Sequence, residues 1–227
     1  MQSHVVRLTS EVPLTFRTQK AADSVNLNIK EKSVHELKVL ADFESPFSVG
    51  VIVGSSGSGK TTLAKQLFGI EDYKLDLTRP IIEQFPHDMP YDECVDALTG
   101  VGLSSIPCWI RPAYTLSNGQ RARAEAALRI ATAKPGETIV FDEWTSTVDR
   151  TVAQIMSHRL QKAVREKGLR VVVCACHHDV VPWLNADWVV DCNTAEFSKK
   201  KAHDQPLNLP SGSATENPGR ILASITI

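Results

Sequence analysis

Residues 54–62 read GSSGSGKTT, and this stretch decides the fold. It matches the pattern G-x-x-x-x-G-K-[ST], in which glycines let backbone N–H groups curl around phosphates without a Cβ clash. The apolar run FSVGVIV precedes it, and KTTLAKQLFG at 60–69 has a helical pattern closed by Gly69. A strand before the loop and a helix after it predict a phosphate-binding loop, because the helix N-terminus then faces the anion.

The residues of this loop have distinct expected roles. We expect Lys60 to neutralise the β- and γ-phosphates of a nucleotide and the Thr61 hydroxyl to bind Mg²⁺. The whole loop is expected to bind the phosphates of a nucleotide through Gly54, Ser55, Ser56, Gly57, Ser58, Gly59, Lys60, Thr61 and Thr62.

Two acidic residues follow the apolar stretch TIVF at 138–141. We expect Asp142 to hold the Mg²⁺ shell. Glu143 is one residue further along, points away from it, and is suited to polarise a water molecule. An acidic pair at a strand end, downstream of a phosphate-binding loop, predicts metal-assisted hydrolysis.

A second candidate anion site lies at LSNGQ, residues 116–120, which opens a strong helical pattern. Ser and Gly at a helix N-terminus favour an anion. We expect Asn118 to cap this helix and Pro135-Gly136 to end it. Two anion sites in one chain, only one of which has a lysine, require an explanation.

Composition and charge limit the class of protein. The 227 residues carry a formal net charge of -1, which argues against a strongly basic nucleic-acid binder. No apolar run approaches the ~20 residues of a membrane helix, so we expect no membrane insertion. The five cysteines are odd in number and no secretory signal precedes them, so we expect a cytoplasmic location. Cys174 and Cys176 are interpreted as buried strand cysteines beside a functional histidine, with a metal site that includes His177 and His178 as the alternative.

The order of these motifs resembles that of the ATP-binding-cassette (ABC) ATPases. The match consists of GSSGSGKTT as Walker A, LSNGQ as the signature, IVFDE as Walker B, STVD at 146–149 as the D-loop and CHHD at 176–179 as the switch segment. It covers about residues 34–192. The resemblance implies an α/β fold, a P-loop NTPase of ABC type with a mostly parallel sheet core, a small β lobe and a reduced helical lobe carrying the signature. It also implies an ATP-dependent homodimer packed head to tail, in which each signature completes the partner's ATP site and so explains the second anion site.

The resemblance assigns roles to the signature and the D-loop. It implies that Ser117 and Gly119 contact the γ-phosphate of the partner's nucleotide, with Asn118 in the place of a commoner glycine and Gln120 at the end of the motif. It implies that Asp149 couples the two sites.

Three further positions are assigned in the same way. His178 aligns with the switch histidine that reaches the γ-phosphate, and His177 is the alternative. Gln84, in IIEQF, resembles the Q-loop glutamine that senses Mg²⁺ and the attacking water. Trp144 stands where many members have proline and is interpreted as a packing residue. The aromatic residue that stacks on adenine is not placed.

The domain boundaries follow from these motifs. We expect an N-terminal extension or β lobe at 1–30, the ATPase domain at 31–195 with its helical lobe at about 86–135, and a polar tail at 196–227. Within the tail, RILASITI at 220–227 has the pattern of a last strand. A closer resemblance, carried by residues 101–131, 141–153 and 176–191, is to a family of soluble bacterial and mobile-element ABC ATPases. Some of its members have a fused acetyltransferase domain, which we do not expect here.

The expected function is therefore a soluble ABC-type ATPase that binds and hydrolyses Mg-ATP at a head-to-tail dimer interface. It is expected to act on nucleic acid or on a soluble protein partner. The KKK run at 199–201 would suit nucleic acid, but a solvated turn is the favoured interpretation of that run. One alternative is an ATP-gated binding module with slow hydrolysis. Another is the nucleotide-binding subunit of a transporter, for which the 55 residues between Lys60 and Leu116 are a short helical lobe.

Overall fold

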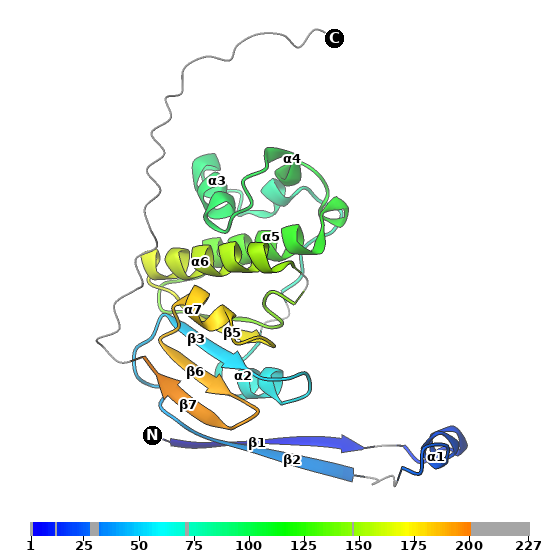
Figure 1. Ribbon diagram of the computed structural model, residues 1–227. Coiled ribbons are helices and arrows are strands. Elements are labelled where there is room, and N and C mark those ends of the chain that lie inside the picture. The colour runs from blue at the N-terminus through cyan, green and yellow to red at the C-terminus, as the bar shows by residue number, and fades with distance from the viewer. Residues whose placement is uncertain (1, 12, 28–31, 71–72, 147, 201–227) are drawn as a thin grey trace.

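The computed structural model describes residues 2–11, 13–27, 32–70, 73–146 and 148–200 (Figure 1). The expected last strand at 220–227 and the final lysine of the 199–201 run lie outside this part of the chain. Where the chain is described, no helix is long and apolar enough to cross a membrane.

A five-stranded sheet forms the centre of the molecule. Its strands are β3 (Val49–Val53), β4 (Thr138–Phe141), β5 (Arg170–Ala175), β6 (Trp188–Asp191) and β7 (Glu196–Lys199). The spatial order is β4-β5-β3-β6-β7; the first four are parallel, and β7 is antiparallel to β6. The central strands are runs of valine and isoleucine because both of their faces are covered. The expected mostly parallel core is confirmed.

The small β lobe is a long antiparallel hairpin of β1 (Gln2–Glu11) and β2 (Lys32–Ala41). Helix α1 (Phe16–Asp23) lies at its far end, where Thr15 and Thr18 form a capping box. In Figure 1 the hairpin runs beneath the sheet, and α1 projects beyond the rest of the molecule. Its second strand ends at Ala41. The expected boundary at residue 30 lies outside the described residues, and the domain boundaries stay predictions.

The helices cover the sheet and build the second lobe. They are α2 (Lys60–Phe68), α3 (Tyr91–Gly100), α4 (Ile106–Trp109), α5 (Asn118–Thr132), α6 (Arg150–Glu166) and α7 (Val180–Leu184), with 3-10 helices η1 (Ile81–Gln84) and η2 (Ala113–Thr115). In Figure 1, α5 and α6 lie side by side above the sheet, and α3 and α4 form the far end of the molecule.

The sheet separates two hydrophobic clusters. Val51 and Val53 of β3 pack in the cluster that contains Leu128 of α5 and Leu160 of α6. Ile52, which points the other way, packs in the cluster that contains α2 and the hairpin. This alternation follows from the two-residue period of a strand. It anchors β3 from both sides, and β3 leads directly into the phosphate-binding loop.

The structure corrects four details. Ser117, not Asn118, caps α5, because its hydroxyl accepts from the Gln120 N–H while the Gln120 side chain accepts from the Ser117 N–H. Helix α5 ends at Thr132, before the proline. The segment expected as a polar tail begins with β7, an edge strand whose one apolar side chain, Phe197, packs against Phe43 and Trp188. Cys174 is buried but Cys176 is exposed, because β5 ends between them at Ala175.

Candidate nucleotide-binding site

The phosphate-binding loop is organised around its lysine. Gly59 precedes α2 with a φ of 96°, in the left-handed region that glycine adopts without strain. Lys60 is 7% exposed, and its Nζ donates to the carbonyl oxygens of Gly54 (2.8 Å) and Ser55 (2.7 Å). An ammonium group has three protons, so one remains for an anion in the loop. The buried Ser58 hydroxyl also has no hydrogen-bond partner, as expected of a loop shaped for a ligand.

The two expected Mg²⁺ ligands lie together. The Thr61 hydroxyl, in the first turn of α2, donates to Asp142 Oδ2 over 2.8 Å. Both side chains are exposed. A hydroxyl and a carboxylate are hard oxygen donors, and Mg²⁺ is usually bound by one or two such groups together with phosphates and water. This pair therefore fits the metal.

The alternative metal site is not assembled. In the part of the chain that the structure describes, no three His, Cys, Asp or Glu side chains gather as a metal site. Burial raises the pKa of the Cys192 thiol to about 11 and also raises that of Cys174, so both thiols are neutral at physiological pH.

Glu143 is exposed, and its neighbour Trp144 is buried. Its φ of 51° and that of Thr145, 67°, lie in the left-handed region, which costs free energy for residues other than glycine. Trp144, between them, is 5% exposed; its N–H donates to the Cys174 carbonyl and its Nε1 to the Ser157 hydroxyl, both over 2.9 Å. The expected packing role of Trp144 is confirmed. Packing of the indole thus keeps the strained turn in place and leaves Glu143 exposed.

The signature packs on the D-loop of its own chain. Ser117 and Asn118 are exposed at the start of α5, whereas Gly119 is buried. A Cβ at Gly119 would lie 2.5 Å from Val148 Cγ1, so only glycine fits there without a shift. Asp149, one residue further, caps α6 by accepting from the Val152 N–H over 3.0 Å.

The switch segment is joined to neighbouring elements by side chains. His178 Nε2 lies 2.8 Å from Asp191 Oδ2, at the end of β6. Asp179 forms an ion pair with Arg150, whose guanidinium also lies over the Trp183 ring, 4.9 Å from its centroid. His177 is exposed beside them. Neither Asp191 nor Arg150 belongs to a motif that is recognisable in the sequence, so neither was expected at this site.

The chain was compared with family models and with known proteins. No family model matches the chain. The energy-coupling factor transporter ATP-binding protein EcfA1 of Leuconostoc mesenteroides is 26% identical over 243 residues, which cover 82% of this chain and 88% of the relative.

Solved structures give the fold. The dimeric structure of the ATP-binding cassette MJ0796 bound to ADP and Pi is 18% identical with a TM-score of 0.55, and covers 76% of this chain and 94% of that one. The dimeric structure of MJ0796, a bacterial ABC transporter cassette, has a TM-score of 0.54 at 18% identity and covers 74% and 92%.

The chain has the fold of an ABC-type ATP-binding cassette. The expected P-loop NTPase architecture is thereby confirmed. The comparisons give no support to the closer resemblance to mobile-element ATPases.

Gln84 lies at the end of η1 in this cassette, and its side chain bonds the backbone of the preceding turn. Its Nε2 donates to the carbonyl oxygens of Asp76 (2.8 Å) and Arg79 (3.1 Å), and its Oε1 accepts from the Asp76 N–H over 3.0 Å. These bonds hold the turn at 76–79. A role for Gln84 at Mg²⁺ requires that they break, and it stays a prediction.

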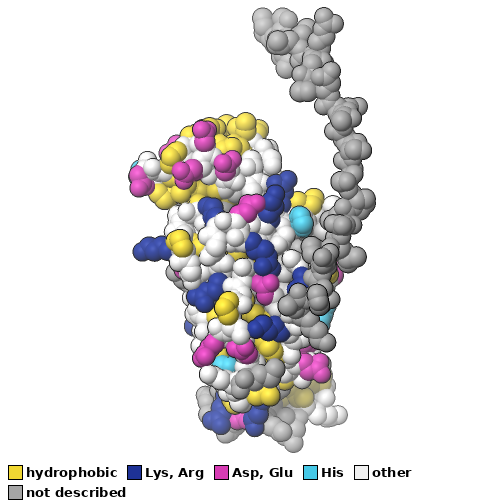
Figure 2. Space-filling model, turned by 90° about the vertical axis from the view of Figure 1, so that its left-hand side faces the viewer, with side chains coloured by type: hydrophobic (Ala, Val, Ile, Leu, Met, Phe, Trp, Pro, Cys, Tyr) yellow, Lys and Arg dark blue, Asp and Glu magenta, His cyan; other side chains and the backbone are white. Residues whose placement is uncertain are grey.

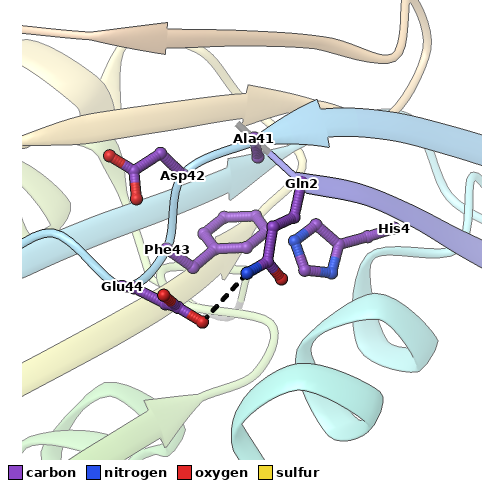
Figure 3. Close-up of a pocket in the computed structure, with 6 residues that line it drawn as sticks. All are labelled: Gln2, His4, Ala41, Asp42, Phe43 and Glu44. Atoms are coloured by element: carbon purple, nitrogen blue, oxygen red, sulfur yellow. Dashed lines mark hydrogen bonds between the residues drawn. The ribbon is translucent and has the colours of Figure 1, made fainter.

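A pocket of about 130 Å³ lies elsewhere in the cassette (Figure 3). It is lined by Gln2, His4, Ala41, Asp42, Phe43 and Glu44. Phe43 packs against Trp188, the first residue of β6. The phosphate-binding loop follows the carboxyl end of β3, which is parallel to β6, so the pocket lies at the opposite end of the sheet and is not the nucleotide site.

Proposed function

We propose that this cassette binds Mg-ATP at residues 54–62 and hydrolyses it. The observation that carries the proposal is the joint placement of the Lys60 ammonium inside its loop and of the Thr61–Asp142 oxygen pair beside it. Lys60 has a proton left for the β- and γ-phosphate oxygens. Mg²⁺, when bound, would neutralise the charge that develops on those oxygens.

Glu143 is the residue proposed to orient and activate the attacking water. It is an exposed carboxylate directly after Asp142, on a turn that Trp144 holds in place. Loss of a general base typically slows a reaction by ~10²–10⁴-fold. Turnover of Glu143→Gln should therefore fall by about this factor while Mg-ATP binding persists. Unchanged turnover would remove Glu143 from the reaction.

The second half of each ATP site is proposed to come from another copy of the chain. Ser117 is exposed at the N-terminus of the 15-residue helix α5, where backbone N–H groups favour an anion. Both solved structures named above are described as dimeric. A head-to-tail pair would bring Ser117 and Gly119 of one copy to the γ-phosphate held by the other.

We infer that the cassette drives a transporter as its nucleotide-binding subunit. The relative EcfA1 is named as a transporter ATP-binding protein. The helical lobe has exposed apolar side chains available for a membrane subunit, namely Leu77, Ile106, Ile110 and Tyr114. Leu77 and Tyr114 are neighbours, since the Tyr114 N–H donates to the Leu77 carbonyl over 2.9 Å. Figure 2 shows hydrophobic and acidic side chains together at this end of the molecule.

Action on nucleic acid has less support. The Lys and Arg side chains on the face in Figure 2 are scattered among acidic and uncharged ones. Of the lysine run, Lys199 lies 3.8 Å from Asp42, and Lys200 donates to Asn185. No comparison points to a nucleic-acid partner.

Matched variants test the transporter role. The Glu143→Gln protein with ATP is used to capture partners from detergent-solubilised membranes, and these are identified by mass spectrometry. A protein with membrane-spanning helices should be captured. Ile110→Glu, at a side chain 63% exposed on the lobe, should abolish capture, whereas Leu40→Glu, at 57% exposed on the hairpin, should not. Capture of nucleic acid alone, or equal capture by both variants, would contradict this role.

A further inference from the structure

We propose that Asp191 and Asn193 form a clasp that positions the switch histidine His178 and the Walker A residue Ser55 relative to one another. The clasp connects the ends of β5 and β6 with the phosphate-binding loop. The proposal rests on the proposed function, because its consequence is a fixed arrangement around the γ-phosphate of ATP. Asp191 acts through His178 and is therefore a positioning residue.

The first contact, between His178 and Asp191, lies next to the start of the phosphate-binding loop. His178 follows β5, and Asp191 is the last residue of β6. The strand between β5 and β6 is β3, which leads into the phosphate-binding loop. The 2.8 Å contact between His178 Nε2 and Asp191 Oδ2 thus crosses the carboxyl end of β3.

The carboxylate of Asp191 is held independently of the histidine. Its Oδ1 accepts from the Asn193 N–H over 2.8 Å, and Oδ2 remains for the imidazole. Burial raises the pKa of Asp191, but the hydrogen bonds from Asn193 and His178 outweigh this effect and leave the pKa below its usual value. The group is charged at neutral pH and can only accept, so His178 donates through Nε2 and Nδ1 remains for another partner.

The second arm of the clasp reaches the loop itself. Asn193 Oδ1 accepts from the Ser55 N–H over 3.1 Å and from the Ser55 hydroxyl over 2.8 Å. The Ser55 carbonyl in turn accepts from Lys60. An unbroken series of hydrogen bonds therefore runs from His178 through Asp191, Asn193 and Ser55 to Lys60.

This series fixes the switch imidazole relative to the loop before nucleotide binds. Preorganised donors stabilise developing charge without reorganisation during the reaction, and a misplacement of about 1 Å costs about 10²-fold in rate. The Asp191 carboxylate would repel the γ-phosphate if the imidazole did not lie between them. The clasp should therefore matter for ATP and not for ADP, which lacks that phosphate.

The test is a double-mutant cycle with Asp191→Asn and His178→Ala. Asn at 191 keeps the size of the side chain and an oxygen for the Asn193 N–H, but it loses the charge that holds the imidazole. We expect kcat and the preference for ATP over ADP, measured by calorimetry, to fall about 10- to 100-fold, the effect of a lost charge-assisted hydrogen bond. ADP affinity and the melting temperature should not change. In the His178→Ala background, Asp191→Asn should cause no further loss, and ATP affinity should rise if it changes at all, because the carboxylate that then repels the γ-phosphate has lost its charge.

Other results overturn the clasp. An equal loss in both backgrounds, or an equal loss for ATP and ADP, would mean that Asp191 acts through the fold. An unchanged kcat would mean that the contact between His178 and Asp191 does not contribute to catalysis. A stronger preference for ATP over ADP would mean that the Asp191 carboxylate competes with the γ-phosphate for His178 Nε2. Thr194→Ala, in the same turn, is the control and should leave every value unchanged. If the wild type does not bind ATP, the proposed function itself fails, which is a distinct result.

Discussion

Gly119→Ala tests the contact between the signature and the D-loop without any nucleotide. The new Cβ would lie 2.5 Å from Val148 Cγ1, and valine is a stiff, branched side chain that cannot swing away cheaply. Overpacking of this kind costs about 1–3 kcal/mol. Alanine in a helix gains up to about 1 kcal/mol over glycine. With the full propensity gain we therefore expect a net loss of up to about 2 kcal/mol in unfolding free energy, or up to about 8 °C in melting temperature for a domain of this size.

Urea denaturation and thermal melting of the nucleotide-free protein measure the effect. Val148→Ala removes the clashing methyl group, so Gly119→Ala in that background should be neutral or stabilising. If Gly119→Ala raises the melting temperature of the otherwise wild-type protein, helix propensity outweighs the contact and the close packing of the two motifs is refuted. An equal loss in both backgrounds would refute it as well.

Three further perturbations probe other contacts. Lys60→Ala should weaken ATP binding at least about 10- to 100-fold by calorimetry, because a buried charged donor is lost, whereas the exposed Lys65→Ala on the same helix should bind normally. Trp144→Phe should lower the unfolding free energy by at least about 1–3 kcal/mol in urea, because it leaves the buried Ser157 hydroxyl without its donor. Burial raises the pKa of Asp187, but bonds from two backbone N–H groups and an arginine lower it overall, so its contribution to stability is present above about pH 4 and lost in acid. Asp187→Asn should therefore flatten the fall in urea stability between about pH 7 and pH 3.

Local patterns predicted much of this molecule. The loop at 54–62, the helix that follows it and the buried strands before the loop and before the acidic pair depend on glycine spacing and apolar periodicity over a few residues, and the structure has them where they were expected. The helix is capped by Ser117 and not by the expected Asn118, because Gln120, three residues after Ser117, completes a capping box. The sequence contained this signal.

Contacts between distant residues could not be predicted in this way. Asn193 bonds Ser55 across 138 positions, and no periodicity relates a polar residue in an edge turn to a phosphate-binding loop. The close approach of Gly119 to Val148 depends on how two helices pack, not on either motif alone. Strand β7 was missed because it is a four-residue edge strand with a single apolar side chain, Phe197, which is too little for a recognisable apolar alternation.

We propose that two copies of this cassette close head to tail around ATP. Light scattering of Glu143→Gln tests it, because ATP that is bound but not hydrolysed links the copies by mass action. We expect a monomer without nucleotide, a dimer with saturating Mg-ATP, and no dimer when Ser117→Arg is added to fill the partner's phosphate site. A protein that binds ATP by calorimetry yet stays monomeric would rule out head-to-tail closure.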